Sequence, residues 1–190
     1  AGDALTDADY NTAVGFNSLS TDTLGGRSTA VGYGALQTQN FTTATSVYNT
    51  AVGFSAGTAV TTGVQNTLIG GLAGDALTDG DYNVAIGYQT LSDDDGGAHN
   101  TAIGYFALEN FNGGAGEGYN TMIGTQAGRN ISTGLSNTAV GSLAMGSGTT
   151  TGNDNTALGY SAGLSLTSGT YNSIIGSYAG DALTTGIRNV

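Results

Sequence analysis

A short pattern of polar and apolar residues recurs at nearly constant intervals along this chain. The pentad Asn-Thr-Ala-Val-Gly, or a close variant, starts at positions 11, 28, 49, 66, 83, 100, 120, 137, 155 and 172, and an eleventh copy starts at 189. The usual spacing is 17, and three spacings exceed it by four, three and one residues. Repetition with a short fixed period is the sequence signature of a solenoid. We therefore interpret residues 1–190 as a single repeat array.

A longer repeat lies above the short one. The four coils that start at Asn11 and the four that start at Asn83 form two blocks of equal length, and in both blocks the second coil is the longest. This correspondence indicates the duplication of a unit of four coils.

The pentad itself predicts a strand. When its Asn is numbered 0, position +1 is mostly Thr, +2 mostly Ala, +3 always aliphatic and +4 always Gly. Side chains alternate between the faces of a strand, and β-branched residues favour strands. We expect the aliphatic column to line the core with Thr, and Asn, Ala and Gly to share the opposite face. The predicted core residues are Val14, Val31, Val52, Ile69, Ile86, Ile103, Ile123, Val140, Leu158 and Ile175. The pentad and turn glycines are Gly15, Gly32, Gly53, Gly70, Gly87, Gly104, Gly124, Gly141, Gly159 and Gly176.

The period predicts an all-β fold, a parallel β-solenoid or β-roll of ten coils. A repeat of this length is too short for a helical hairpin, but it suits one turn of a solenoid whose strands stack. Neighbouring coils would lie ~4.8 Å apart, which gives a rod of roughly 48 Å. The chain begins and ends in the middle of a coil, without the atypical capping repeats that solenoids need. We therefore expect a segment of a longer fibre, which continues end to end.

Two further positions of the repeat vary together, so that a large residue at one accompanies a small residue at the other. Close packing of a narrow core requires such a relation. Position +8 is Leu or Met in five coils and Gly in the other five. Where it is Gly, position +11 is aliphatic: Val60, Leu77, Ile131, Leu166 and Leu183. We interpret both positions as facing a common interior.

Two polar features predict how the coils turn and stack. A Gly recurs three residues before most pentads, as in Gly63 and Gly80, and we expect it to supply a positive φ at a corner. The Asn at position 0 follows this corner, and we expect the stacked Asn side chains to form an amide ladder.

The expected outer strip of Ala and Gly suggests self-association. Such small residues on an exterior allow the close approach of another backbone, most simply in a parallel homotrimer. The alternative is that the strip is a crowded wall of a single solenoid.

Two known repeat groups resemble this pattern over essentially the whole chain. Asn83-Val-Ala-Ile-Gly87 is similar, with one change, to the Ser-Val-Ala-Ile-Gly coils in the heads of trimeric autotransporter adhesins. The stretches 49–57 and 100–108 resemble more closely the Asn-Thr-Ala-Val-Gly-Tyr-x-Ala-Leu arrays of bacteriophage and viral tail fibres. The resemblance implies a parallel β-roll, trimerisation, and a location outside the cell or on the virion surface.

Charge and composition exclude several classes of function. The net charge is −11, Lys is absent and only three Arg are present, so the chain cannot neutralise a nucleic-acid backbone. No apolar run approaches the roughly 18 residues of a membrane span, so we expect no membrane insertion. Cys is absent, so there is no disulfide and no thiolate metal site.

The sequence carries no catalytic motif, and we do not expect an enzyme. The only histidine, His99, occupies the variable position before a pentad, which favours a solvated loop residue. We expect no cofactor. Structural Ca²⁺ remains an option at residues 7–11 and 79–83, where acidic residues and an Asn alternate, but the Gly and Glu that complete an EF loop are missing.

Aromatic residues are the better candidates for binding. They recur at position +5 and immediately before the pentad, and the lengthened coils add Phe41 beside Asn40 and Phe111 beside Asn110. Aromatic rings with neighbouring amides are suited to gripping sugar rings, so these four residues are candidate glycan contacts. Stacked rings also stabilise solenoids by about 0.5–1.5 kcal/mol per pair, which is the structural alternative.

The sequence thus predicts a structural shaft segment of an extracellular or virion fibre that supports attachment to a host or surface. The alternative is a trimeric adhesin head that binds glycan or matrix through its lateral surface and lengthened corners.

Overall fold

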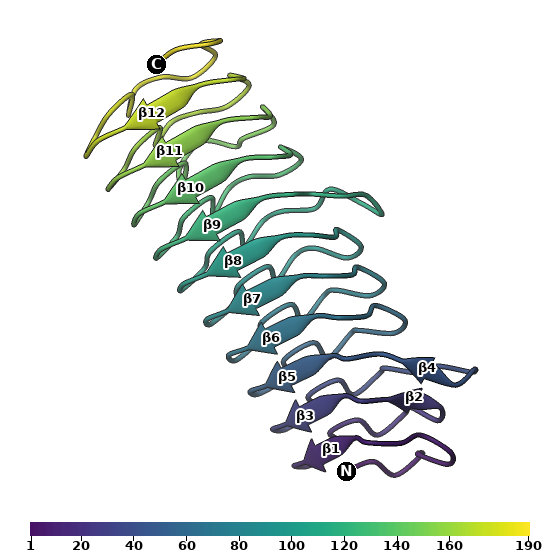
Figure 1. The fold of residues 1–190 in the computed structure, drawn as a ribbon. Coiled ribbons are helices and arrows are strands. Elements are labelled where there is room, and N and C mark those ends of the chain that lie inside the picture. The colour runs from purple at the N-terminus through teal and green to yellow at the C-terminus, as the bar shows by residue number, and fades with distance from the viewer.

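Short strands stacked one above another form one wall of the molecule, from β1 near the N-terminus to β12 near the C-terminus (Figure 1). This computed structural model describes all of residues 1–190. The strands are β1 (Thr12–Val14), β2 (Gly25–Gly26), β3 (Thr29–Val31), β4 (Thr45–Ser46), β5 (Thr50–Val52), β6 (Thr67–Ile69), β7 (Val84–Ile86), β8 (Thr101–Ile103), β9 (Thr121–Ile123), β10 (Thr138–Val140), β11 (Thr156–Leu158) and β12 (Ser173–Ile175). No helix has the length and apolar character that crossing a membrane requires.

Ten of these strands form one parallel sheet in the order β1-β3-β5-β6-β7-β8-β9-β10-β11-β12. The register places equal pentad positions side by side, as in Thr12 with Thr29 and Val14 with Val31. The predicted parallel solenoid, with its usual coil repeat of 17, is therefore confirmed. The extra residues of the first lengthened coil lie at a corner, where β2 and β4 form a separate two-stranded sheet.

The prediction of which strand face lies inside was wrong. Position +2 faces the core: Ala30, Ala51 and Ala85 are fully buried. The aliphatic residues at +3 lie on the outer face, and Val14 and Ile175 are 56% and 69% exposed. None of the ten predicted core residues, Val14, Val31, Val52, Ile69, Ile86, Ile103, Ile123, Val140, Leu158 and Ile175, belongs to the buried cluster.

The narrowness of the interior explains this inversion. Most coils have room for only an Ala at +2, because the side chain at +8 reaches into the same space. A larger residue occurs at +2 only in coils with Gly at +8, as Leu68 does with Gly74, although Ala51 and Ala157 keep Ala beside such a Gly. A Cβ added to Gly57 or Gly74 would collide with the side chain of Leu68, so Leu68 fills the volume that both glycines leave.

The predicted exchange between positions +8 and +11 is confirmed. The buried residues at +8 are Leu19, Leu36, Leu91, Leu108 and Met145, and those at +11 are Val60, Leu77, Ile131 and Leu166. Nearly every coil therefore contributes one large side chain to a continuous core from one of these two positions.

The pentad glycines turn the chain sharply after each strand. Their φ angles run from 124° to 147°, a region that side chains rarely adopt. A Cβ at Gly32 would also overlap the carbonyl oxygen of Gly53 in the next coil. The corner glycines before the pentad act differently from our expectation. They do not have a left-handed φ, and Gly is needed because a Cβ at Gly63 would lie 2.5 Å from the carbonyl oxygen of Gly80.

A ladder of buried Asn side chains joins successive coils, but most of its rungs are not the predicted bonds between one amide and the next. Asn66 Oδ1 accepts a hydrogen bond from the backbone N–H of Asn83 at 2.9 Å, and Asn66 Nδ2 donates to the carbonyl of Gly80 at 2.8 Å. Most rungs therefore join a side chain to the backbone of the next coil. Direct amide-to-amide bonds occur only from Asn155, Asn172 and Asn189 to the Asn below.

Candidate functional site

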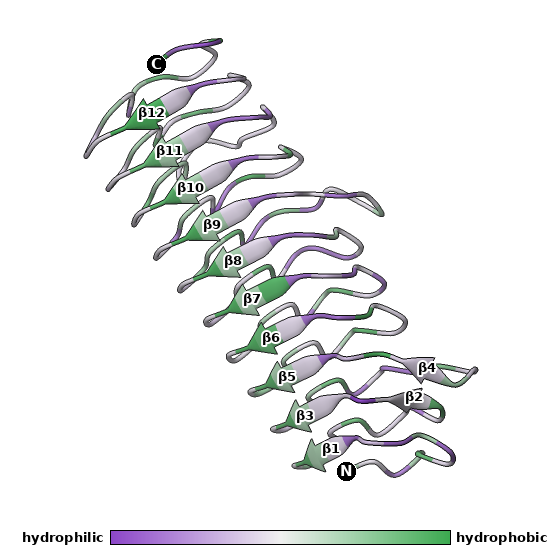
Figure 2. Cartoon of the chain, in the orientation of Figure 1, coloured by the Kyte–Doolittle hydropathy of each residue, from purple (hydrophilic) through white to green (hydrophobic).

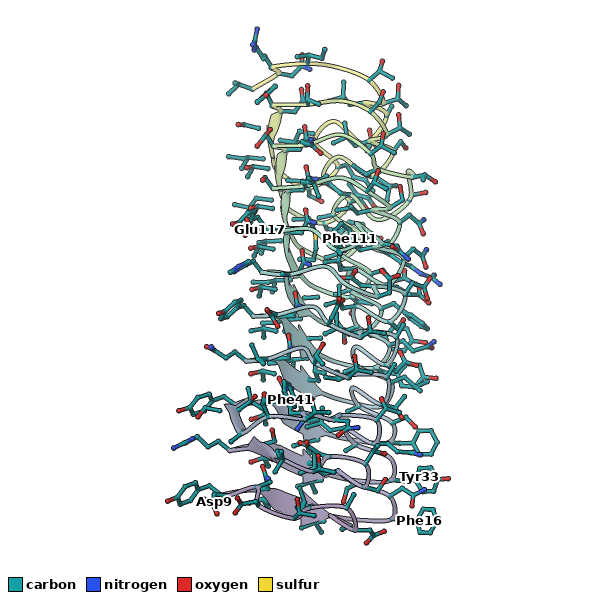
Figure 3. All side chains as sticks on the ribbon, turned by 90° about the vertical axis from the view of Figure 1, so that its right-hand side faces the viewer. Asp9, Phe16, Tyr33, Phe41, Phe111 and Glu117 are labelled. Carbon is teal, nitrogen blue, oxygen red and sulfur yellow. The ribbon has the colours of Figure 1, made fainter.

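The two longest coils, which exceed the usual length by four and three residues, hold the residues that the sequence suggested as glycan contacts, but the structure places both phenylalanines inside. Phe41 is 8% exposed and Phe111 is fully buried, and Figure 3 shows both between the two sides of the rod. This corrects the prediction that they bind a sugar. Phe111 belongs to the hydrophobic core, whereas Phe41 is buried outside it, beside Asp22 and Gly25.

The neighbouring amides are also engaged within the chain. Asn40 is half-buried, and its Oδ1 accepts a hydrogen bond from Thr23 Oγ1 at 3.4 Å. Asn110 Nδ2 donates to Asn130 Oδ1 at 2.7 Å. Each amide therefore bonds a neighbouring coil of the same chain.

A buried polar network stabilises the first lengthened coil, where Ser28 replaces the ladder Asn. Gln39 supplies the missing amide: its Nε2 donates to Asp22 Oδ2 at 2.6 Å and its Oε1 accepts from Asn49 Nδ2 at 2.9 Å. Asp22 Oδ1 accepts the backbone N–H groups of Gly25 and Phe41, each at 3.0 Å. The side-chain oxygen and nitrogen atoms of Asp22, Gln39 and Asn49 all have partners.

The equivalent network of the second lengthened coil is incomplete. Asp94 occupies the place of Asp22 in the second block and is fully buried, but Phe111 stands where a glutamine like Gln39 would have bonded it. Asp94 Oδ1 accepts the N–H of Gly97 at 2.9 Å, whereas Oδ2 has no partner. Burial raises the pKa of Asp94 to about 6. The Nδ2 group of Asn100 is also buried without a partner.

The first lengthened corner overhangs a pocket on the outside of the rod. Its cavity has a volume of about 150 Å³ and spans three successive coils. Asp7 and Asp9 line one wall, and the corner residues Thr45 and Ser46 line another; the remaining lining residues are Tyr10, Leu24, Gly26, Arg27 and Ala44.

A second pocket lies beneath the second lengthened corner, with a volume of about 200 Å³. It is lined by Asp79, Gly80, Asp81, Gly96, Ala98, Ala115, Gly116 and Glu117. Asp79 and Asp81 occupy the places of Asp7 and Asp9 one block further along the chain. Asp9 and Glu117, one from each pocket, lie on the same side of the rod (Figure 3). The two pockets are thus equivalent sites in successive blocks of the chain.

A column of aromatic and cationic side chains runs beside both pockets, at the position before each pentad. Arg27 lies between Tyr10 and Tyr48, with its guanidinium carbon 5.3 and 5.6 Å from their ring centroids. His99 stacks in the same way between Tyr82 and Tyr119, at 4.8 and 5.2 Å. His99 is therefore a half-buried member of a stack, where the sequence favoured a solvated loop residue.

The aromatic residues at position +5 form a second column on the other side of the rod, where Phe16 and Tyr33 project (Figure 3). Phe16, Tyr33 and Phe54 stack at successive centroid distances of 5.3 Å, and Tyr88 and Tyr105 at 5.8 Å. Their faces contact one another, which favours the structural interpretation of this column.

The acidic segments that resemble calcium loops do not bring their ligands together. Asn11 and Asn83 donate into the Asn ladder and are not available beside the outer carboxylates. No group of three or more carboxylate or imidazole side chains lies close enough to hold a metal ion.

The outer face of the large sheet carries the aliphatic residues of position +3 in a single file. Figure 2 shows a hydrophobic residue at the arrowhead of each of its strands. Ile69, Ile123 and Leu158 are 36%, 38% and 46% exposed. An outward column of Val, Ile and Leu is unusual, because the solvated face of a sheet is normally polar.

Comparisons of the chain with protein-family models, with curated proteins and with solved structures gave no match. The function is therefore argued from the geometry of the chain itself.

Proposed function

We propose that this chain is a structural shaft segment of an extracellular or virion fibre, in which parallel copies pack through the aliphatic column of the outer sheet face. The single observation that carries the proposal is the unbroken file of partly exposed Val, Ile and Leu along all ten strands of the sheet. The fibre would support attachment to a host or another surface.

The size of this face suits a specific interface. From the residue before the pentad to position +3, the face is ~16 Å wide, and the rod is ~48 Å long. The resulting area of roughly 770 Å² is close to the ~800 Å² that each partner buries in a standard interface. Burying the rest of each half-exposed aliphatic side chain contributes about 1 kcal/mol before the costs of association.

Our proposal retains the parallel homotrimer expected from the sequence, but assigns it to a different surface. The Ala residues that suggested close contact between copies are in the core. A parallel trimer around the column at +3 would instead place three apolar files against one another. The sheet is in register over its whole length, so two copies can match coil by coil.

The fold also supports a role as a stiff spacer. Each coil bonds to the next through the sheet, the corners and the buried Asn ladder. The same geometry gives no support to an enzymatic activity. The second candidate function is a trimeric adhesin head that binds glycan through its lateral surface. The two equivalent corner pockets favour that alternative and are considered below.

Sedimentation equilibrium tests the shaft proposal. The wild-type chain is expected to sediment with three times the mass of one chain. Replacing Ile86 and Ile103 by Lys puts charges in the middle of the column, so the Ile86→Lys/Ile103→Lys variant should be a folded monomer.

A matched control places the same two charges elsewhere. Thr62 and Thr149 are exposed and lie outside the sheet, and Thr62→Lys/Thr149→Lys should keep the mass of the wild type. A monodisperse wild-type monomer would refute self-association through this face.

A further inference from the structure

We infer that the two corner pockets are paired binding sites, each for one hydroxyl-rich sugar ring of a surface polysaccharide. This inference rests on the proposed role in attachment and names the site through which it would occur. In this inference the sugars are bound by carboxylates, those of Asp7, Asp9, Asp79 and Asp81. Phe41 and Phe111 instead stabilise the corners from inside.

The placement of the pockets is the first reason. Both lie beneath a lengthened corner, and their lining residues occupy matching positions of three successive coils. The acidic pairs stand four and two residues before a pentad, and Ala44 and Ala115 each stand five residues before the pentad of the coil above.

The third block lacks the pocket because it lacks the corner. Thr151 and Asn153 occupy the places of Asp79 and Asp81 one block further along, but the coils above them have the usual length and no cavity forms there. An acidic pair therefore lies below each of the two coils that are lengthened by four and three residues. A corner needed only to cover a buried aromatic ring would not require two carboxylates outside it.

The carboxylates of the walls are the second reason. Asp7 and Asp9 make no side-chain hydrogen bond within the chain. In the second pocket, Asp79 and Asp81 each use only Oδ1, which accepts Thr78 Oγ1 at 3.3 Å in Asp79 and the N–H of Val64 at 2.7 Å in Asp81. The remaining carboxylate oxygens can accept strong charge-assisted hydrogen bonds from hydroxyl groups.

Small apolar side chains complete the lining, Ala44 in one pocket and Ala115 in the other. A sugar ring has a polar edge of hydroxyl groups and a face of C–H groups. Hydroxyl acceptors beside a small apolar patch match both.

The volumes fit a single ring. At about 30 Å³ per water molecule, cavities of 150 and 200 Å³ hold roughly five to seven waters. This is below the ~300 Å³ at which pockets for larger ligands begin. A metal ion is a poorer match, because no group of three carboxylate or imidazole side chains converges.

The repeat sets the distance between the sites. They are separated by four coils, or ~19 Å along the rod, and lie on the same side (Figure 3). One polysaccharide chain can therefore occupy both pockets, and the second contact forms at a high effective concentration.

Binding is tested with an array of bacterial surface polysaccharides and with soluble glucose, galactose and N-acetylglucosamine followed by NMR, all in EDTA. The wild-type chain should bind at least one polysaccharide and two copies of its component sugar. Asp79→Asn/Asp81→Asn should leave one sugar site and weaken binding to the polysaccharide by ~10²-fold. Ala115→Leu, which fills the same pocket without changing charge, should do the same.

The control removes two charges outside the pockets. Asp3 and Asp181 are exposed and line neither cavity, so Asp3→Asn/Asp181→Asn should bind like the wild type. The inference is overturned if no sugar binds in EDTA, or if the control loses as much affinity as the pocket variants. Sedimentation of the same samples separates the two proposals, because a trimer that binds no sugar leaves the shaft function standing.

Discussion

The two longest coils differ in how they pair the buried aspartate beneath them. Both stand above a buried aspartate, Asp22 or Asp94, and both add an aromatic ring to the interior. The first coil also carries Gln39, whose amide bonds Asp22, Ser28 and Asn49. The second carries Phe111 at that position, which fills space but offers no hydrogen bond.

This difference shows what a repeat tolerates. The first coil keeps a complete polar network, whereas the second replaces it with apolar volume and leaves Asp94 Oδ2 and Asn100 Nδ2 without partners. Burying an unpartnered polar group costs about 1–3 kcal/mol. The stack of coils holds the second corner in place despite that cost, so equal positions in the two blocks should respond oppositely to the same substitution.

The largest effect is expected from Phe111→Ala. Removing a fully buried ring leaves a cavity, which should lower the free energy of unfolding by about 3–5 kcal/mol. Urea denaturation measures the change. The control is Phe16→Ala, which truncates a ring that is 65% exposed and should cost much less. Equal losses for the two variants would show that Phe111 does not fill the core.

Asparagine substitutions at the two aspartates should have opposite signs. Asp94→Asn removes a charge that is buried beside an unpartnered oxygen, and should stabilise the chain at pH 7 by up to about 3 kcal/mol. Asp22→Asn weakens three hydrogen bonds to a charged acceptor and should destabilise it by about 1.5–3 kcal/mol. Thermal unfolding of both variants checks the comparison, and a change of the same sign in both contradicts it.

Stability should also depend on pH through Asp94. Its pKa is about 6 in the folded chain and has the ordinary value of 3.8 when unfolded, so the folded chain binds this proton more tightly. The contribution of this proton to the stability of the folded chain is therefore fully present below pH 4 and is lost as the pH rises through 6. Between pH 4.5 and 6.5, the wild type should lose about 2 kcal/mol relative to Asp94→Asn. Parallel profiles for the two proteins would rule out this role of Asp94.

The smallest effect is expected in the column at +5. Tyr33 stacks between Phe16 and Phe54, and Tyr33→Ala should cost about 1–3 kcal/mol, since each aromatic pair contributes about 0.5–1.5 kcal/mol. Ser142 stands at position +5 of its own coil and carries no ring, so Ser142→Ala serves as the control in the same denaturation series. No difference between them would mean that the rings add nothing to stability.

Much of the fold could be predicted from the sequence because one coil is bonded to the next at equal positions. The period, the Asn ladder and the exchange between +8 and +11 follow from this. The inward face could not be read from residue size alone: large aliphatic residues at +3 suggested burial, whereas the interior admits mostly Ala at +2. The useful signal was that Leu68, Met122 and Ile174 occur at +2 where position +8 is Gly.

The candidate site was less predictable. The sequence indicated the lengthened corners, but it could not show that Phe41 and Phe111 turn inward. That depends on the volume enclosed by the extra residues. The pockets combine residues from three coils, and only the stacking brings Asp79 and Asp81 under Glu117.

A density map of one coil at side-chain resolution tests the orientation of the strands most directly. In the coil that begins at Asn66, Leu68 should point into the interior between Gly57 and Gly74, and Ile69 should project from the outer face of β6. A map with Ile69 in the core and Leu68 outside would contradict the account.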